Sequence, residues 1–245
     1  MELATTDQQA GKSFYSSLFG WQPFDTPMGP DEAYTMFNLN GGLVGAAYKL
    51  DPVKMPGVPA HWGLYITVAS ADETAAKVAA AGGTVCAGPF DVMTFGRMAV
   101  LQDPTGATFM IWEPRDHQGS SVGGEVGTLC WADLMSKDPA AAAKFYSGIF
   151  GWEIAAGKDE SGYLHIKNGE QFIGGIPPLH FQNPNAPPHW LIYFLVTDCD
   201  ASTAKAKELG ASVHMGPMTM EGVGRWSVVA DPQGAVSALF QALPH

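Results

Sequence analysis

Two histidine–tyrosine pairs lie at the start of apolar stretches that are typical of β-strands. The segment AHWGLYITVASAD carries His61 and Tyr65, and PHWLIYFLVTDCD carries His189 and Tyr193. Residues separated by two or four positions on a strand share a face, so each histidine is expected on the same face as its tyrosine. An imidazole with an unperturbed pKa of about 6.5 suits proton transfer near neutral pH. Each segment could therefore supply an acid–base group to a binding site.

A structural role is the alternative for both histidines. Each follows a proline closely, in VPAHW and PPHW, at the point where a strand begins. An imidazole at such a point can bond to a backbone carbonyl and fix the path of the chain into the strand. The sequence leaves both interpretations open.

Composition restricts the partners. The 245 residues carry a formal net charge of -11, and the sequence pI is about 4.9. Binding to nucleic acid or to an anionic membrane needs clustered Lys and Arg, so we expect neither. No apolar run is long enough to span a bilayer, and the amino terminus lacks the pattern of a secretion signal, so a cytoplasmic protein is expected. The three cysteines show no CxxC spacing, which argues against a disulfide framework or a structural zinc site.

The chain contains a long internal repeat. TTDQQAGKSFYSSLFGW, at residues 5–21, returns as SKDPAAAAKFYSGIFGW at 136–152, and FGRMAVLQDPTGA at 95–107 returns as VGRWSVVADPQGA at 223–235. The segment between the halves is rich in Gly, Ser and charged residues, as an exposed linker should be. We predict a first domain over residues 1–114, a linker over 115–127 and a second domain over 128–245.

Each half alternates strands and helices. Asp7 and Gly20 are typical of the start and end of a helix, and Asp138 and Gly151 repeat them. A shorter Ala-rich helix is expected over 72–83. Strands are expected over 33–40, 43–50, 63–70, 96–103 and 108–114. The order strand, helix, several strands occurs four times, which predicts an α+β fold.

The motifs FYSSLFGW and FYSGIFGW and the two DPxGA turns, set in a repeated βαβββ module, resemble the vicinal oxygen chelate superfamily. That superfamily includes glyoxalase I, bleomycin- and fosfomycin-resistance proteins and extradiol dioxygenases. The resemblance covers nearly the whole chain. It implies four βαβββ modules in two tandem glyoxalase-like domains, whose sheets form U-shaped half-barrels that each hold a small molecule. The superfamily also contains non-catalytic binders, so the fold does not fix the function.

The resemblance implies a divalent metal, held by a His, Gln or Glu in the first strand of a module and a Glu in its last strand. Counting from the helix and turn aspartates, the positions that fall within the chain hold Trp131, Gly63, Leu191, Met110 and Ala238. None of these side chains provides an oxygen or nitrogen ligand for such an ion. We therefore expect no cofactor, with a displaced metal site as the alternative.

The candidate site residues lie on the face that the resemblance assigns to the ligand. Those expected to transfer protons or to form polar contacts are His61, His189, Asp133 and Glu2. Those expected to contact the ligand are Tyr65, Tyr193, Trp131, Met110, Arg97, Arg225 and Phe240. Alternatively, the two carboxylates pair with the two arginines, and the repeated Gly-Arg is structural.

Three functions remain open at this stage. The first is binding or transformation of a small, partly apolar organic molecule without a metal. The second is a metal-dependent lyase, isomerase or dioxygenase with a displaced site, in which Glu2 or Asp133 and a histidine are the ligands. The third is a non-catalytic structural or interaction protein. The fused halves supply an internal pseudo-twofold axis, so we expect a monomer.

Overall fold

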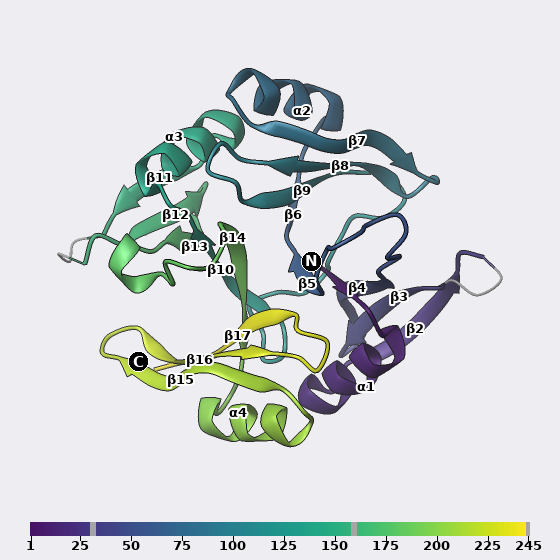
Figure 1. Cartoon of the computed structure of the whole chain (residues 1–245), viewed down its shortest axis with the longest axis vertical. Helices are drawn as coiled ribbons and strands as arrows, with labels where there is room; N and C mark the ends of the chain where they lie inside the picture. Colours follow the sequence, from purple (N-terminus) through teal and green to yellow (C-terminus); the bar gives the residue numbers. More distant parts are fainter. Residues whose placement is uncertain (30–32, 158–160, 244–245) are drawn as a thin grey trace. The chain divides into compact units, whose positions relative to one another are not determined.

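Four times along the chain, a strand is followed by a helix and then by three more strands, which is the predicted βαβββ order (Figure 1). The structure is a computed structural model that describes residues 1–29, 33–157 and 161–243. The α+β class and the four modules are thereby confirmed. Within the described residues, no helix is both long and apolar enough to cross a membrane.

The elements of the first sequence half are β1 (Glu2–Thr5), α1 (Gln8–Phe19), β2 (Gln22–Pro27), β3 (Ala33–Leu39), β4 (Gly42–Lys49), β5 (His61–Gly63), β6 (Tyr65–Thr67), α2 (Ala71–Ala80), β7 (Thr84–Val92), β8 (Gly96–Gln102) and β9 (Thr108–Pro114). Those of the second half are β10 (Leu129–Met135), α3 (Pro139–Phe150), β11 (Glu153–Ala156), β12 (Leu164–Asn168), β13 (Gln171–Ile176), the short 3-10 helix η1 (Leu179–Phe181), β14 (His189–Leu195), α4 (Cys199–Glu208), β15 (Ser212–Met220), β16 (Gly224–Ala230) and β17 (Val236–Ala242).

The chain folds into two compact units that do not follow the sequence halves. The first unit contains Met1–Gly63, Ser120–Cys130 and Ile192–His245, and the second contains Leu64–Gly119 and Trp131–Leu191. Each unit therefore combines one module from each half. The boundaries at residues 114 and 128 delimit the repeat in the sequence. That they also delimit folding domains stays a prediction.

The strand order is given for each unit separately. In the first unit, the amino-terminal strands follow the order β2-β3-β4-β1-β5, and the carboxy-terminal ones follow β14-β17-β16-β15. In the second unit, the corresponding orders are β6-β9-β8-β7 and β11-β12-β13-β10. The first strand of each module pairs in parallel with the last, as β1 does with β4 and β6 with β9. This parallel pairing places the crossover helix on one face of the sheet.

Helix ends follow the repeated sequence. The Asp7 side chain accepts a hydrogen bond from the backbone N–H of Ala10 at 2.9 Å, which caps α1. Gly20 ends the helix with a φ of 78°, in the left-handed region that glycine adopts readily. Asp138 and Gly151 repeat this arrangement in α3. The two helices are thus defined by the same residue types, as predicted.

One face of each sheet is covered by helices, and the opposite face is not. In the second unit, Leu101, Phe109 and Ile111 are fully buried in a cluster that includes Val78 of α2 and Phe145 of α3. Strand residues alternate between faces, so residues between these positions lie on the other face. Figure 1 shows α2 against β7–β9 and α4 against β15–β17. We call the uncovered face of each sheet its helix-free face.

A buried hydrogen-bond network ties α1 to its sheet in the first unit. The Tyr15 hydroxyl donates to Asp231 Oδ2 at 3.0 Å and accepts from Trp62 Nε1 at 2.8 Å. Burial raises the pKa of Tyr15, and the charge of Asp231 raises it further, so the phenol stays protonated and remains a donor. In the second unit, the Tyr146 hydroxyl accepts from Trp190 Nε1 at 3.0 Å in the corresponding place.

The substitution Tyr15→Phe removes this hydroxyl and leaves the Trp62 N–H and one Asp231 oxygen without their partner inside the fold. We expect the free energy of unfolding to fall by about 1–3 kcal/mol, measured by urea denaturation. Ser13→Ala, on an exposed part of the same helix, is the control and should change it by less than about 0.5 kcal/mol. Equal stability of the two variants would contradict a structural role for the network.

Candidate ligand-binding site

A buried carboxylate with two hydrogen-bond donors lies on the helix-free face of the second unit. Asp133 is on β10 and only 5% exposed, and its neighbour Leu134 packs on the helix side. The Tyr163 hydroxyl donates to Asp133 Oδ1 at 2.5 Å, and Trp131 Nε1 donates to the same oxygen at 3.0 Å. A charge-assisted hydrogen bond of this length is among the stronger ones in proteins. The three side chains form one hydrogen-bonded cluster.

Local backbone geometry brings these side chains together. Trp131 and Asp133 are two residues apart on β10 and therefore share a face. Gly175, on β13, lies opposite Asp133 on one side and opposite His165 of β12 on the other. A Cβ atom at Gly175 would overlap the Tyr163 hydroxyl. The absence of a side chain at this glycine therefore allows Tyr163 to reach the carboxylate.

The first unit contains an equivalent carboxylate–tyrosine pair. Glu2, on β1, accepts a hydrogen bond from the Tyr34 hydroxyl at 2.6 Å. Tyr34 precedes Tyr163 by 129 positions and Glu2 precedes Asp133 by 131, so both members of the pair are repeated. The phenol of Tyr48 lies near enough to Glu2 that burial and this charge raise its pKa to about 12. The pair is thus a repeated feature of the fold.

Electrostatics fixes which group carries the proton in each pair. Burial raises the pKa of Tyr163, and the negative charge of Asp133 raises it further. The pKa of Tyr34 is raised by burial and by Glu2 in the same way. Each tyrosine is therefore a protonated donor at neutral pH. A carboxylate held by such donors can accept a further hydrogen bond, or a proton, from a bound molecule.

One aromatic ring, that of His165, contacts both aromatic members of the Asp133 cluster. The His165 ring lies 4.9 Å from that of Tyr163 and 6.5 Å from that of Trp131, measured between centroids. Phe172, which is 57% exposed, lies 5.7 Å from His165. Polar groups among aromatic side chains are typical of sites for partly apolar ligands.

The two predicted histidines contact backbone carbonyls. Nδ1 of His61 lies 2.9 Å from the Pro59 oxygen, and Nδ1 of His189 lies 2.8 Å from the Pro187 oxygen. This is the structural arrangement that the sequence offered as an alternative. It leaves the predicted catalytic role of both residues untested, and the structure gives it no further support.

The two predicted arginines are bound by carboxylates, of which Asp72 and Asp200 lie in the first turns of α2 and α4 and Asp91 lies on β7. Arg97 contacts Asp72 at 2.7 Å and Asp91 at 2.9 Å, and Arg225 contacts Asp200 of α4. These contacts match the structural alternative, although the partners are not Glu2 and Asp133. Contact of either arginine with a ligand stays a prediction.

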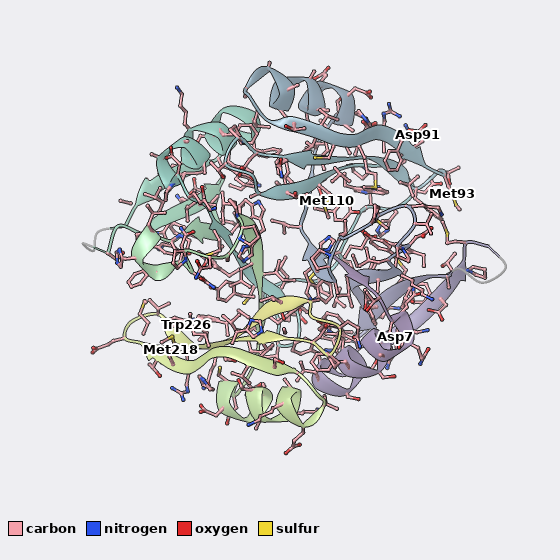
Figure 2. All side chains as sticks on the ribbon, viewed as in Figure 1. Asp7, Asp91, Met93, Met110, Met218 and Trp226 are labelled. Carbon is pink, nitrogen blue, oxygen red and sulfur yellow. The ribbon has the colours of Figure 1, made fainter. Side chains whose placement is uncertain are left out.

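The remaining predicted residues lie in register on neighbouring strands. Tyr65 is opposite Met110 in the β6–β9 pair, and its hydroxyl contacts the sulfur of Met98 at 3.9 Å. Tyr193 is opposite Ala238, and Phe240 is opposite Trp226. Met110 is 8% exposed. In Figure 2, Met110 lies on the side of β9 away from α2.

The metal that the fold family implies does not fit these residues. The five positions that correspond to family ligands hold two large apolar side chains, a methionine, an alanine and a glycine. Hard and borderline cations need oxygen or nitrogen ligands there. Across residues 1–29, 33–157 and 161–243, no group of three His, Cys, Asp or Glu side chains is placed to hold an ion. We derive no chemistry through a metal.

A hollow elsewhere in the first unit contains none of the predicted site residues. It lies beside α1 and β2 and is lined by Gln9, Lys12, Ser13, Ser16, Pro23 and Asp25. Lys12 and Asp25 form an ion pair of 2.8 Å within it.

Comparison with protein families identifies the class. The family model of the Glyoxalase/Bleomycin resistance protein/Dioxygenase superfamily matches residues 1–111 and again 128–238. The chain therefore belongs to this superfamily, with two tandem copies of its domain.

Two relatives match along almost their whole length. The chain is 39% identical over 253 residues to "Putative glyoxylase CFP32" of Mycobacterium bovis, covering 100% of this chain and 94% of that protein. It is 34% identical over 249 residues to the anthracycline biosynthesis protein DnrV of Streptomyces peucetius, covering 96% and 89%.

Solved structures support the fold. The Mn(II)-bound glyoxalase from Novosphingobium aromaticivorans has a TM-score of 0.67 at 18% identity, covering 99% of this chain and 81% of that one. The 2,3-dioxygenase LapB from Pseudomonas sp. KL28 has a TM-score of 0.65 at 13% identity, covering 100% and 91%. At such low identities, these similarities show the shared fold alone.

Sequence reasoning missed Tyr34, Tyr48 and Tyr163. It found Glu2 and Asp133 because residues two apart on a strand share a face, but it gave them no tyrosine partner. A signal existed, because aligning the halves places Tyr34 and Tyr163 together at an offset of 129. The contact itself depends on strands that are adjacent in the sheet but distant in sequence. The alternation of faces along one strand does not reveal which strands are adjacent.

The substitution Gly175→Ala places a methyl group where the Tyr163 hydroxyl lies. We expect Tyr163 to leave Asp133, and its pKa to move back toward the usual range as burial and the nearby charge are lost. Ultraviolet titration of the phenols, compared with Tyr163→Phe, measures this shift. Gly148→Ala, whose Cβ meets nothing within 4 Å, is the control and should leave the titration unchanged. An unchanged titration in Gly175→Ala would contradict the proposed packing.

The side chains at the family's metal positions, which offer no oxygen or nitrogen ligand, also predict the metal content of the purified protein. We expect protein purified without chelators to hold much less than one equivalent of Zn, Ni, Mn or Fe per chain by elemental analysis. About one equivalent, retained after brief treatment with a chelator, would show that a displaced site exists.

Proposed function

We propose that this protein binds, or transforms without a metal, a small and partly apolar organic molecule, and that Asp133 and Tyr163 anchor its polar group. The observation that carries the proposal is the buried carboxylate–tyrosine pair on the helix-free face, two residues from a family ligand position. Its repetition as Glu2 and Tyr34 supports a role tied to the fold's binding face.

The chemistry of the pair fits a ligand that donates a proton or a hydrogen bond. An ionised Asp133 can accept hydrogen bonds but cannot donate them. It therefore favours a ligand hydroxyl or amide N–H, which donates, over a ligand carbonyl, which only accepts. Tyr163 and Trp131 stabilise the negative charge of Asp133 by donating hydrogen bonds to it. In a metal-containing member of the family, the cation would offset such a charge. If a reaction occurs, Asp133 can take a proton from one ligand atom and return it to another. That sequence gives an isomerisation in which atoms and charge balance without an oxidant.

The relatives support an aromatic ligand class. DnrV is named for anthracycline biosynthesis, and anthracyclines are built on fused aromatic rings with phenolic hydroxyls. Such a molecule offers both an apolar body and a donor for Asp133. The name of the mycobacterial relative favours the second candidate, a lyase or isomerase of the glyoxalase type with a displaced metal, for which elemental analysis is the test.

We further propose a cytoplasmic monomer that binds neither nucleic acid nor membrane. Cys86, Cys130 and Cys199 are all free thiols, which favours a reducing compartment. The net charge of -11 disfavours polyanionic partners. A non-catalytic interaction protein remains the outcome if no small molecule binds.

The test uses 1,4-dihydroxyanthraquinone as the probe, titrated by fluorescence against the full chain. We expect Asp133→Asn and Tyr163→Phe each to raise Kd by about tenfold or more, because each removes a hydrogen bond at a buried charge. Glu170→Gln, at a fully exposed side chain, is the control and should leave Kd within about twofold. Equal Kd values for all variants would refute Asp133 as the anchor.

A further inference from the structure

A cationic side chain lies on the same helix-free face as Asp133, two strands away in the second unit (Figure 1). Asp133 on β10 is opposite Gly175 on β13, and Gly175 is opposite His165 on β12. Lys167 follows His165 by two residues and shares its face, whereas Ile166 between them is fully buried in the core cluster. One face of this sheet therefore carries both a carboxylate and an ammonium group.

A series of ring contacts connects the two charged groups. The Trp131 indole donates to Asp133, and its ring centroid lies 6.5 Å from that of His165. The His165 centroid lies 5.7 Å from that of Phe172 on β13. Lys167 Nζ in turn lies 5.5 Å from the centroid of the Phe172 ring. The carboxylate, the rings and the ammonium group thus form one continuous surface.

The ammonium group of Lys167 is held loosely by the protein itself. Its ion pair with Glu170 has a distance of 3.8 Å, and the Glu170 side chain is fully exposed. Such a surface pair contributes little free energy. Among the described residues, no carboxylate forms a shorter ion pair with Lys167. An anionic group of a bound molecule can therefore contact this ammonium group without breaking a strong interaction.

The first unit holds different side chains at the equivalent positions. An offset of 129 matches His165, Lys167 and Phe172 to Met36, Asn38 and Leu43, respectively. In both units the second of these positions is opposite the third, directly after a shift in the strand register. The backbone pairing is therefore alike, and the imidazole, ammonium and phenyl groups belong to the second unit alone.

We propose that the second unit binds an aromatic acid that carries a hydroxyl group at the opposite end of its ring system. The hydroxyl donates to Asp133, and the anionic group contacts Lys167. The rings lie against His165 and Phe172, of which Phe172 is 57% exposed. This inference rests on the proposed function in one respect, that Asp133 anchors the polar group of the ligand. It adds the ligand's charge and its direction across the sheet.

Strand geometry indicates the length of such a ligand. Asp133 and Lys167 are two strand spacings and two residues apart, which places their Cα atoms about 12 Å from each other. Two fused rings with substituents at opposite ends span most of this distance, and the flexible stem of Lys167 covers the remainder. The compound 6-hydroxy-2-naphthoic acid has this arrangement and is fluorescent. Its relatives 2-naphthol and 2-naphthoic acid each lack one of the two polar groups.

The experiment measures Kd for these three probes by fluorescence titration of the native full chain and its variants. We expect 6-hydroxy-2-naphthoate to bind about tenfold more tightly than 2-naphthol, because only the acid contacts Lys167. The substitution Lys167→Met should raise the Kd of the acid by about tenfold and leave that of 2-naphthol within about twofold. Lys167→Arg retains the charge and should keep most of the affinity.

The matched control is Lys144→Met, which removes the same charge from an exposed position on α3. It should leave every Kd within about twofold. Added salt provides a second readout, because it should weaken binding of the acid and not of 2-naphthol. Melting temperatures of all variants within a few degrees of the native value verify that the fold is intact.

Equal Kd values for the acid and 2-naphthol on the native chain would overturn the inference, as would equal effects of Lys167→Met and Lys144→Met. If Asp133→Asn raises the Kd of 2-naphthol while Lys167→Met leaves that of the acid unchanged, the inference fails and the proposed anchor stands. If Lys167→Met acts and Asp133→Asn does not, the anchor is rejected and the two-ended ligand with it. A chain that binds none of the probes rejects both.

Discussion

The alternation of side chains along β-strands is the constraint on which the rest of this structure depends. Each module has a single helix, and that helix packs against one face of the module's strands. Leu101 and Phe109 lie on that face, in the core cluster beside α2. The other face has no helix to cover it. Every second strand residue is therefore available for a ligand, for the protein's own chain or for polar networks. Asp133 and Trp226 lie on that face for the same reason that Leu134 and Ser227 lie on the other.

Duplication allows the two halves to use this face differently. Residues that maintain the fold have stayed alike, because Asp7, Gly20 and Tyr15 have counterparts that cap and tether the later helix. The helix-free face shows more change. The Trp112 indole N–H donates to the His117 carbonyl of the linker that follows β9, whereas its repeat equivalent, Phe240, has no such donor. The repeated fold therefore carries different side chains on the two helix-free faces.

The sequence predicted the parts of the fold that local rules determine. Caps such as Asp7 and Gly20, the repeat and the family were all accessible, because they depend on short segments. The strand expected over 63–70 instead forms β5 and β6 and begins at His61, and β7 was not identified because most of its residues are exposed and show no alternation. The Tyr163–Asp133 contact and the grouping of modules into units depend on distant segments, which local patterns do not specify.

The Asp133 cluster also shows how neutral donors can hold a buried carboxylate. Metal-binding members of a fold place a divalent ion where carboxylates converge, and the ion offsets their charge. Here a single carboxylate is offset by an indole N–H and a phenol, and burial keeps that phenol protonated by raising its pKa. The indole and the phenol are both neutral donors, so they orient the carboxylate without cancelling its charge. A carboxylate oriented by such donors can still act as an acceptor.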